Sequence, residues 1–367
     1  MELKRHLYIC DQTFEFFNII NLQISINKNI PADILFSDKN SFGNIIEKVK
    51  KKNLFQNVYT LQVKDFEAAF YSKEKEERCN IVLNPREYIS FPDFTDYYTD
   101  IWINISNIHA KLEYYNLIKL GMKPKVHLIQ EGIANYTFTN SISEEDAMWE
   151  DYYGELAFSK NIEDNYIYRI SAFVGSGIEN KMLMPIKENK EEFIHIMEDL
   201  YGRVSLPKQK WIYMETSLFD MNIMTNEFEI FENLAKIVGK ENIIVKQHPR
   251  NKIDRYRPLG YQVMEETEVP WEVMILENIE EIKSKVICSV FSQSLFSPYD
   301  VFSIEAKSIM LLKLLRHHVF FYEKKEWKQY ISEMEQEINK GSLQLYVPES
   351  VDELNNIIRF LLLDGRE

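Results

Sequence analysis

Short apolar runs alternate in this chain with segments whose apolar residues recur at helical spacing, and this alternation constrains the fold more than any other feature. Runs of β-branched and aromatic residues indicate buried strands, whereas spacings of three and four residues indicate amphipathic helices. Strands that alternate with helices form parallel sheets with right-handed crossovers. The first part of the chain predicts strands over residues 7–10, 32–36, 58–63, 101–105 and 126–129, with helices over 14–24, 44–52 and 109–120 between them.

The same α/β pattern starts again in the second half. A strand is expected over 211–216, followed by a helix that contains Phe228 and ends near Gly239. Further buried strands are expected over 243–246 and 285–290. The second half therefore predicts a second parallel sheet.

The chain has 367 residues, enough for two domains with separate cores. Residues 202–209 contain a proline and are the predicted linker. We expect one α/β domain over 1–205 and a second over 206–350. The remaining residues, 351–367, are expected to form a helix that returns to pack on the first domain.

The stretch Glu241–Arg250 places a basic turn that contains an imidazole at the end of a strand. Three consecutive β-branched residues indicate a buried parallel strand, and Pro249 lacks the N–H needed to continue it. Ligands of open α/β sheets bind beyond the carboxyl ends of the strands. Lys246, His248 and Arg250 are therefore candidates for binding an anion, although a solvated structural turn fits this decapeptide equally well.

Glu131 and Gly132 directly follow the strand expected over 126–129 and its neighbour Gln130. A carboxylate and a glycine at a strand end can offer an acceptor oxygen and let a ligand approach the backbone. A capping carboxylate followed by a turn glycine is the structural alternative.

Two further groups in the second half suit a nucleotide. Pro270 fits the first turn of a helix, which places the Glu272 carboxylate near the helix N-terminus. Ser292, Gln293 and Ser294 follow the strand expected over 285–290, where free N–H groups and hydroxyls can bind phosphate. A simple N-cap serine is the structural alternative.

The formal net charge of −14 argues against general nucleic-acid binding, because binding to the phosphate backbone needs a basic face. Cys10, Cys79 and Cys288 have neither CxxC spacing nor a disulfide framework, which favours a reducing compartment. The seven histidines are scattered. Adjacent His317 and His318 would point about 100° apart on a helix and could not easily share a metal ion.

The N-terminus lacks the long uncharged core of a signal peptide, so a cytoplasmic location is expected. The sequence contains no apolar run of about 18 residues that could span a bilayer. Any membrane contact is expected to be peripheral, on the inner face of the plasma membrane.

Five short motifs follow one another in the order seen in bacterial sialyltransferases: Leu7–Cys10 with the turn after it, Glu131-Gly132, Lys246–Pro249, Pro270–Glu272 and the serine turn 292–294. On these motifs the chain resembles glycosyltransferase family 52, the lipooligosaccharide and capsule sialyltransferases. The pattern covers residues 7–295, and the resemblance depends on the order and spacing of the motifs.

This resemblance implies a GT-B fold with two Rossmann-like domains whose parallel sheets face each other across a cleft. The first domain would bind the acceptor and the second the CMP-sugar. The resemblance also implies CMP-sialic acid as donor, a galactoside-terminated acceptor, inversion at the anomeric carbon, no required metal and a homodimer. The acceptor would be a bacterial capsule or lipooligosaccharide, and the linkage, 2,3 or 2,6, stays open.

Two residues would carry the chemistry. His248, as an imidazolium, would donate a proton or hydrogen bond to the departing phosphate. Glu131 would accept the proton of the attacking hydroxyl, with Asp220, in the turn after the first strand of the second domain, as the alternative base. Lys246 and Pro249 would lie at the nucleotide.

Glu272 would accept from the ribose, and the serine turn would line the phosphate. The turn departs from the family pattern, because Gln293 separates its two serines, so which hydroxyl binds phosphate stays open. Gln130 replaces the first acid of the acidic-acidic-glycine motif. Two alternatives remain: a related transferase that uses another nucleotide sugar, and a non-catalytic GT-B protein that binds a nucleotide or glycan.

Overall fold

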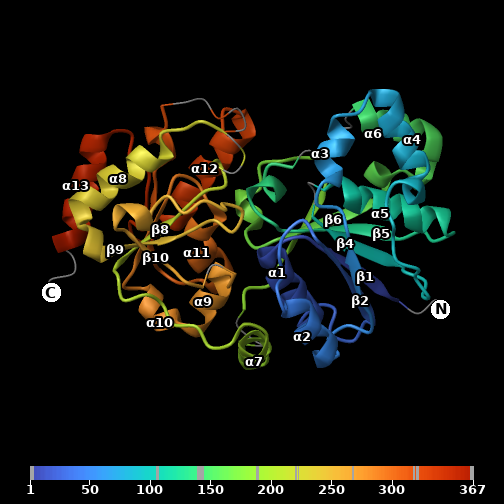
Figure 1. Ribbon diagram of the computed structural model, residues 1–367, viewed down its shortest axis with the longest axis horizontal. Helices are drawn as coiled ribbons and strands as arrows, with labels where there is room; N and C mark the ends of the chain where they lie inside the picture. Colours follow the sequence, from blue (N-terminus) through green and yellow to red (C-terminus); the bar gives the residue numbers. More distant parts are fainter. Residues whose placement is uncertain are drawn as a thin grey trace. The chain divides into compact units, whose positions relative to one another are not determined.

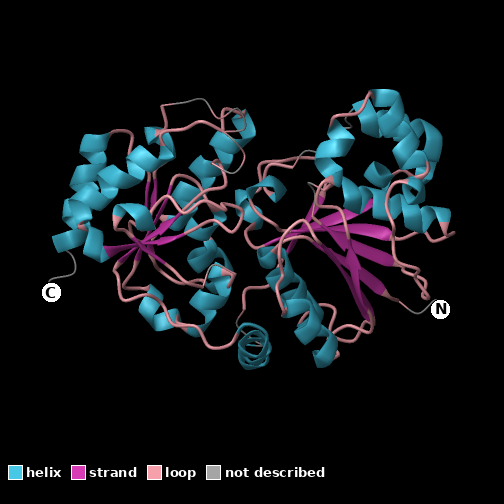
Figure 2. Cartoon of the chain, in the orientation of Figure 1, coloured by secondary structure: helices cyan, strands magenta, loops and turns pink. Residues whose placement is uncertain are grey.

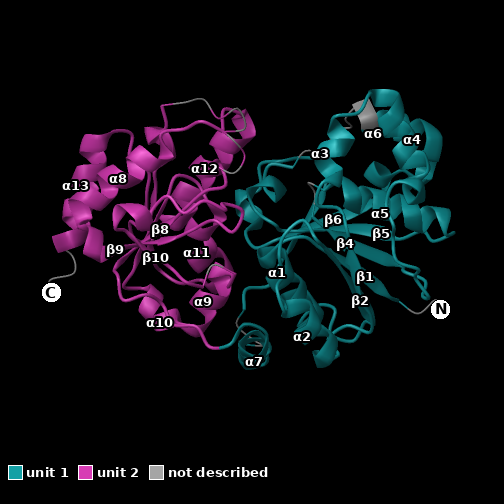
Figure 3. Ribbon diagram, viewed as in Figure 1, with its two compact units in different colours: residues 1–202 teal, residues 203–367 magenta. Residues whose placement is uncertain are grey.

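The computed structural model describes residues 4–104, 107–138, 144–186, 190–219, 221, 223–266, 268–316, 319 and 322–363. The chain divides into two compact units, unit 1 over residues 1–202 and unit 2 over residues 203–367 (Figure 3). Each unit is built on a parallel sheet with helices packed against it (Figure 2).

Unit 1 contains a seven-stranded sheet in the order β3-β2-β1-β4-β5-β6-β7. The five strands expected from the sequence are confirmed, with ends that differ by at most two residues. The strands are β1 (His6–Cys10), β2 (Ala32–Ser37), β3 (Val58–Leu61), β4 (Asp100–Ile103), β5 (Lys125–Ile129), β6 (Ile162–Ile167) and β7 (Glu179–Met182).

Strands β6 and β7 were not expected from the sequence. Asp164 and Asn165 are fully buried in β6, where polar side chains obscure the apolar pattern of a strand. Their partners come from other strands: Asp164 bonds to His127 of β5, and Asn165 bonds to Asn180 of β7. Local sequence could not reveal these pairings.

Unit 2 contains a six-stranded sheet in the order β10-β9-β8-β11-β12-β13. The three strands expected in this half are confirmed as β8, β9 and β11. The strands are β8 (Trp211–Met214), β9 (Ile243–Lys246), β10 (Gln262–Val263), β11 (Val286–Ser289), β12 (Lys307–Met310) and β13 (Leu345–Tyr346).

The α-helices connect and cover these strands (Figure 1). In unit 1 they are α1 (Thr13–Ile24), α2 (Ile45–Lys52), α3 (Phe66–Tyr71), α4 (Lys75–Leu83), α5 (Ile108–Lys119), α6 (Glu144–Tyr153) and α7 (Lys190–Tyr201). In unit 2 they are α8 (Glu227–Val238), α9 (Trp271–Glu277), α10 (Ile279–Ile282), α11 (Ser297–Phe302), α12 (Lys325–Ile338) and α13 (Val351–Leu363).

Helix α13, which we expected to return to the first domain, is part of unit 2 and contacts α8 there. Lys210, next to β8, also donates a hydrogen bond from Nζ to the carbonyl oxygen of Leu361 at 2.8 Å. The C-terminal helix is therefore anchored within the second unit.

Both strand orders contain a switch point, where successive connections leave in opposite directions. It lies between β1 and β4 in unit 1 and between β8 and β11 in unit 2. Ligands of open α/β sheets bind outside the carboxyl ends of strands at such points. A ligand site is therefore expected in the turns after these strands and their neighbours.

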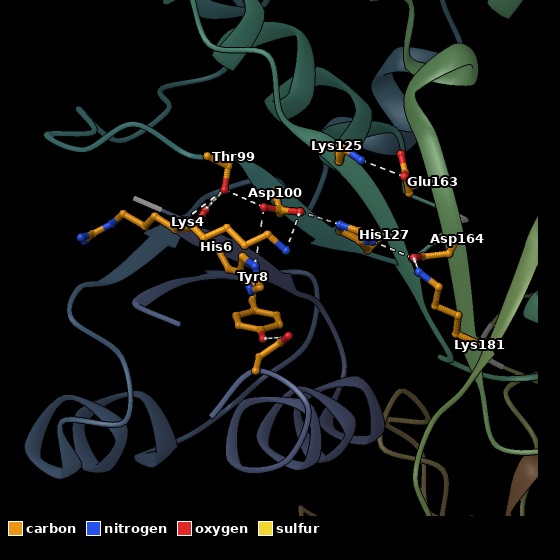
Figure 4. A network of polar contacts seen from close by, with 12 residues as sticks. Lys4, His6, Tyr8, Thr99, Asp100, Lys125, His127, Glu163, Asp164 and Lys181 are labelled. Carbon is orange, nitrogen blue, oxygen red and sulfur yellow. Dashed lines mark hydrogen bonds and ion pairs between the residues drawn. The ribbon is translucent and has the colours of Figure 1, made fainter. Parts of the chain in front are cut away.

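A row of polar side chains crosses the unit 1 sheet near the amino ends of its strands (Figure 4). His127 Nε2 lies 2.8 Å from Asp100 Oδ1, and His127 Nδ1 lies 2.6 Å from Asp164 Oδ1. Lys181 Nζ bonds to Asp164 at 2.6 Å, and His6 Nε2 lies 3.6 Å from Asp100 Oδ2. This row joins five neighbouring strands by side chains as well as by the backbone ladder.

Candidate active site

The basic turn after β9 follows the strand directly, as the sequence predicts. His248 lies two residues beyond the strand end. Its backbone N–H donates to Glu215 Oε2 at 3.1 Å, and its ring Nδ1 accepts from the Arg250 N–H at 3.2 Å. These two bonds fix both the backbone and the ring of His248.

The bond to Nδ1 decides the protonation state of His248. A nitrogen that accepts a hydrogen bond carries no proton, so the neutral ring bears its proton on Nε2. Burial, together with the charges of Arg250 and Lys246, lowers the pKa of His248 to about 4. In this structure His248 is therefore a neutral Nε2–H donor, and not the imidazolium that we expected.

Glu215, directly after β8, is a site residue that the sequence reasoning missed. Besides the His248 N–H, it accepts a hydrogen bond from Arg255 Nη2 to Oε1 at 2.6 Å. The Arg255 guanidinium lies 4.2 Å from the centroid of the Phe219 ring. An acid directly after an apolar strand was the available signal, and it applied to Glu215 as much as to Glu131.

Lys246 is buried at the end of β9, and its ammonium binds the protein itself. Nζ donates to the carbonyl oxygens of Glu266 at 3.3 Å and Val269 at 3.0 Å. Burial lowers the pKa of Lys246 to about 8. Its side chain thus holds the segment that leads into α9, and two of its three N–H donors are already used.

Glu272, the second residue of α9, is also buried. Its Oε1 accepts from the Ser297 hydroxyl at 2.6 Å, and burial raises the pKa of its carboxyl group. The sequence reasoning missed Ser297, which lies beyond the serine turn at the start of α11. This bond joins α9 to α11, so one of the two oxygens expected for the ribose already has a protein partner.

The serine turn directly follows β11 and forms a single 3₁₀ turn, Gln293–Leu295, before α11. The Ser292 hydroxyl accepts from the Ser294 N–H at 3.2 Å, which is an N-cap. The Gln293 amide donates to Asp300 Oδ2 at 3.4 Å, and its buried Oε1 has no hydrogen-bond partner among the residues that the structure describes. The Ser294 carbonyl accepts from Trp271 Nε1 at 3.2 Å.

The Ser294 hydroxyl makes no hydrogen bond to any residue that the structure describes. The turn is therefore fixed through Ser292 and the Ser294 backbone, while the hydroxyl of Ser294 and the amide oxygen of Gln293 keep free hydrogen-bonding capacity.

In unit 1, Glu131 is half-buried beyond the end of β5. Gln12 Nε2 donates to Glu131 Oε1, and the Glu131 N–H donates to Asn135 Oδ1 at 2.9 Å. Asn135 in turn donates to the Ile129 carbonyl at 3.0 Å. The carboxylate is thus positioned by a side chain from the β1–α1 turn and by its own loop.

The neighbours of Glu131 have different roles. Gln130 is fully buried, and its Oε1 accepts from the Tyr168 N–H at 2.9 Å and the Tyr136 hydroxyl at 3.0 Å. Gln130 is therefore a structural residue. Gly132 has an extended backbone, φ 178°, and within 4 Å a Cβ built on it would meet no described atom beyond its two chain neighbours. The space beside Gly132 is open to a ligand.

A buried polar cluster, also missed in the sequence, supports the β1–α1 turn. Asp11 accepts hydrogen bonds from Asn104 Nδ2 at 3.2 Å and from Asn107 Nδ2, and it lies 2.8 Å from His109 Nε2. The Asp11 N–H donates to Glu15 Oε2 at 2.7 Å. These contacts link the ends of β1 and β4 on the two sides of the switch point.

Three predicted positions lie outside the described residues. They are Asp220, the alternative base, and the adjacent pair His317 and His318. Among the residues that the structure describes, no group of three or more His, Cys, Asp or Glu side chains is arranged to hold a metal ion.

Comparison with solved structures identifies the class of fold. A putative UDP-N-acetylglucosamine 2-epimerase from Listeria monocytogenes has a TM-score of 0.51 and 9% identity, covering 99% of this chain and 88% of that chain. The Methanocaldococcus jannaschii UDP-GlcNAc 2-epimerase, in complex with UDP-GlcNAc and UDP, has a TM-score of 0.51 and 12% identity, covering 99% and 94%. With its two parallel α/β sheets, the protein has the GT-B fold.

An alpha/beta-galactoside alpha-2,3-sialyltransferase from Photobacterium phosphoreum is also similar, with a TM-score of 0.47 and 13% identity over 95% of this chain and 99% of that chain. No curated protein matches the sequence. The family model for alpha-2,8-polysialyltransferase matches residues 14–311. The chain belongs to this family and is therefore a sialyltransferase of the GT-B class.

The family model that matches is not that of glycosyltransferase family 52, so the resemblance to family 52 stays a prediction.

Among the helices that the structure describes, none combines the length and the apolar character needed to cross a bilayer.

Proposed function

We propose that the protein transfers sialic acid from CMP-sialic acid to a glycan hydroxyl, with inversion at the anomeric carbon. The observation that carries this proposal is the fixed Nε2–H donor of His248 beyond β9, in a chain of the polysialyltransferase family. The departing CMP is a phosphate anion, and an N–H donor that needs no rearrangement stabilises the charge that develops on it.

His248 acts in two stages in this proposal. It first donates a hydrogen bond from neutral Nε2–H to a phosphate oxygen. The phosphate charge raises the pKa of the ring, because an anion nearby favours the imidazolium. When the Arg250 N–H releases Nδ1, this nitrogen can take up a proton from solvent, and the ring then passes the Nε2 proton to the leaving phosphate.

The remaining nucleotide contacts are assigned to unit 2. We propose that the Ser294 hydroxyl binds phosphate, with Ser292 and Gln293 shaping the turn. Lys246 and Glu272 set the positions of the segments before and within α9, and each keeps one hydrogen-bonding position for the nucleotide. Pro249 holds the His248 turn rigid, because its ring fixes φ.

We assign the general base to Glu131. A carboxylate accepts the proton of the acceptor hydroxyl as the hydroxyl attacks the anomeric carbon. Gln12 Nε2 donates to Oε1 of this carboxylate. Asp220 remains the alternative base. We further propose that transfer needs no metal ion.

The acceptor that we propose is a glycan that ends in sialic acid, because the family is described by the α-2,8 linkage. The galactoside terminus expected from the sequence is the alternative. In either case the product would be a bacterial surface glycan, of a capsule or a lipooligosaccharide.

The test is incubation of the protein with CMP-sialic acid and a panel of sialyl- and galactosyl-terminated glycans, with CMP release and product mass as readouts. We expect CMP release coupled to a mass gain of one sialic acid, unchanged by EDTA. UDP-sugars in parallel reactions test the related-transferase alternative. A folded protein that binds CMP but transfers nothing would contradict the proposal and support the non-catalytic alternative.

A further inference from the structure

Trp271, the first residue of α9, joins this helix to the serine turn after β11. Its indole Nε1–H donates to the carbonyl oxygen of Ser294 at 3.2 Å. The N–H of the same serine donates to the Ser292 hydroxyl at 3.2 Å. Both backbone polar groups of Ser294 are therefore bonded, and one of these bonds comes from a helix outside the turn.

Trp271 is itself held in place by its surroundings. Its side chain is buried, and the next residue, Glu272, accepts a hydrogen bond from the Ser297 hydroxyl at 2.6 Å. The segment before α9 is bound from β9, because Lys246 Nζ donates to the Val269 carbonyl oxygen at 3.0 Å. A buried indole in a fixed segment loses little further side-chain freedom when it bonds to the turn.

These contacts connect two strand ends that are not neighbours. In the sheet β8 lies between β9 and β11, so the His248 turn and the serine turn follow strands about 10 Å apart. A single phosphate group that meets both turns needs their donors at a fixed separation. The path from Lys246 through the start of α9 to the serine turn links the two turns by side chains.

The bond from Trp271 leaves the Ser294 hydroxyl available to a ligand. The indole binds the carbonyl oxygen, whereas the hydroxyl makes no hydrogen bond to any residue that the structure describes. On a backbone that is bonded at both its N–H and its C=O, only the side-chain rotations of Ser294 remain to be fixed when an anion binds. A phosphate oxygen is a strong acceptor for such a hydroxyl, because it carries charge.

We propose that Trp271 is a positioning residue for the phosphate of the nucleotide: through the Ser294 carbonyl it holds the Ser294 hydroxyl where the phosphate binds. This inference rests on the proposed function, in which Ser294 binds the phosphate. Trp271 itself makes no contact with the nucleotide in this proposal, so it affects binding of the phosphate and not of the base.

The test compares the affinities of the whole protein for CMP and for cytidine, which lacks the phosphate. The ratio of the cytidine to the CMP dissociation constant, measured by ligand-detected NMR, reports the contribution of the phosphate alone. It is measured for the parent, Trp271→Phe, Ser294→Ala and the double variant. Trp211→Phe is the matched control, because Trp211 is also buried in unit 2 but lies at the amino end of β8.

We expect Ser294→Ala to lower this ratio about 10-fold or more, since a hydrogen bond to a charged group is lost. Trp271→Phe keeps an aromatic ring without the N–H, and should lower the ratio about fivefold with little change in cytidine affinity. The double variant should match Ser294→Ala, because Trp271 acts through Ser294. Trp211→Phe should keep the parental ratio.

A parental ratio in folded Trp271→Phe, next to a lowered ratio in Ser294→Ala, would overturn the inference and leave the proposed function standing. Effects that multiply in the double variant would also overturn it, because the two residues would then act independently. A parental ratio in Ser294→Ala would overturn the assignment of the phosphate to Ser294, which belongs to the proposed function, and the inference with it.

If Trp271→Phe does not fold, the parent decides. Trp271 is one of five tryptophans, and its indole N–H signal is assigned by replacing the others one at a time. We expect CMP to shift this signal and cytidine to leave it in place. A signal that CMP does not move would overturn the inference.

Discussion

Two histidines, one within a strand and one beyond a strand end, show how position in a sheet decides what a side chain can do. In unit 1, His127 lies within β5, between Asp100 and Asp164 (Figure 4). Burial disfavours charge there, but the hydrogen bonds to both carboxylates outweigh it and raise the pKa of His127. In unit 2, no described carboxylate bonds to the ring of His248, and burial lowers its pKa to about 4.

The two pKa values differ because His127 lies within a strand and His248 lies beyond the end of one. A side chain within β5 meets side chains of neighbouring strands, which satisfy both ring nitrogens of His127. Beyond the end of β9, the ring of His248 accepts one hydrogen bond from the described residues, from an N–H of its own turn. The first arrangement stabilises a fold, and the second leaves a donor for a ligand.

The largest expected effect separates activity from stability at His248. His248→Ala should lower kcat/KM with CMP-sialic acid about 10²–10⁴-fold, the range for a positioned acid or base. The thermal midpoint should stay close to the parental value, because the ring makes one hydrogen bond to the described part of the protein. Steady-state kinetics and calorimetry check both values; parental turnover would remove His248 from the mechanism.

At His127 we expect a large loss of stability. His127→Ala removes the shared partner of two buried carboxylates and should lower the free energy of unfolding of unit 1 by about 3–5 kcal/mol. His195→Ala is the control, because the side chain of His195 is 78% exposed, and it should change stability by less than about 0.5 kcal/mol. Denaturant titration measures this, and equal effects of the two substitutions would show that the network in Figure 4 contributes little.

A smaller effect on activity is expected at Glu215, which binds the His248 turn. Glu215→Gln keeps an oxygen for the His248 N–H but loses the charge that pairs with Arg255. We expect kcat to fall about 10-fold, because a charged hydrogen bond contributes about 1.5–3 kcal/mol. Glu241→Gln, an exposed acid before the same strand, is the matched control. If the two variants are equally active, Glu215 does not position the turn.

A substitution at Gly132, after β5, tests whether a ligand binds beyond the end of a strand in unit 1. Gly132→Ala should leave stability within about 0.5 kcal/mol of the parent, since within 4 Å its Cβ would meet no described atom beyond its two chain neighbours. We expect the acceptor KM to rise about 10-fold, because one methyl group then occupies space for the ligand. Gly341→Ala, where a Cβ also meets nothing, is the control. Identical acceptor kinetics in both variants would mean that no ligand uses this space.

The two histidines should also respond oppositely to pH. The raised pKa of His127 contributes stability that is fully present below the unfolded value of about 6.5 and is lost as pH rises through the folded pKa. The lowered pKa of His248 contributes stability that is present above about 6.5 and is lost as pH falls toward 4. We expect unfolding free energies of His127→Gln and His248→Gln, taken from pH 5 to 8 relative to the parent, to slope in opposite directions. Parallel slopes would contradict the assignment.

The sequence was sufficient where a strand is an uninterrupted apolar run. Strands β1, β8, β9 and β11 contain such runs, and the turns after them could be found without a structure. Strand β6 was missed because Asp164 and Asn165 are buried by partners on other strands. Strands β10 and β13 are only two residues long and give no periodicity.

For the candidate site, the sequence predicted the positions of the residues but not their hydrogen-bond partners. Positions of His248, Glu131 and the serine turn follow from strand ends, and the sequence predicts them. The partners that tune these residues come from distant segments: Glu215 lies 33 residues from His248, and Gln12 lies 119 residues from Glu131. No local pattern reports such contacts, so the neutral state of His248 could not be foreseen.

The most direct test is the nitrogen NMR titration of the histidine rings in the whole protein, with and without CMP. We predict that His248 without CMP is neutral at pH 6, with its proton on Nε2, and that its pKa rises when CMP binds. His127 should stay doubly protonated at pH 6 in both samples. A His248 that is already charged at pH 6 without CMP, and whose pKa does not change on binding, would contradict the account.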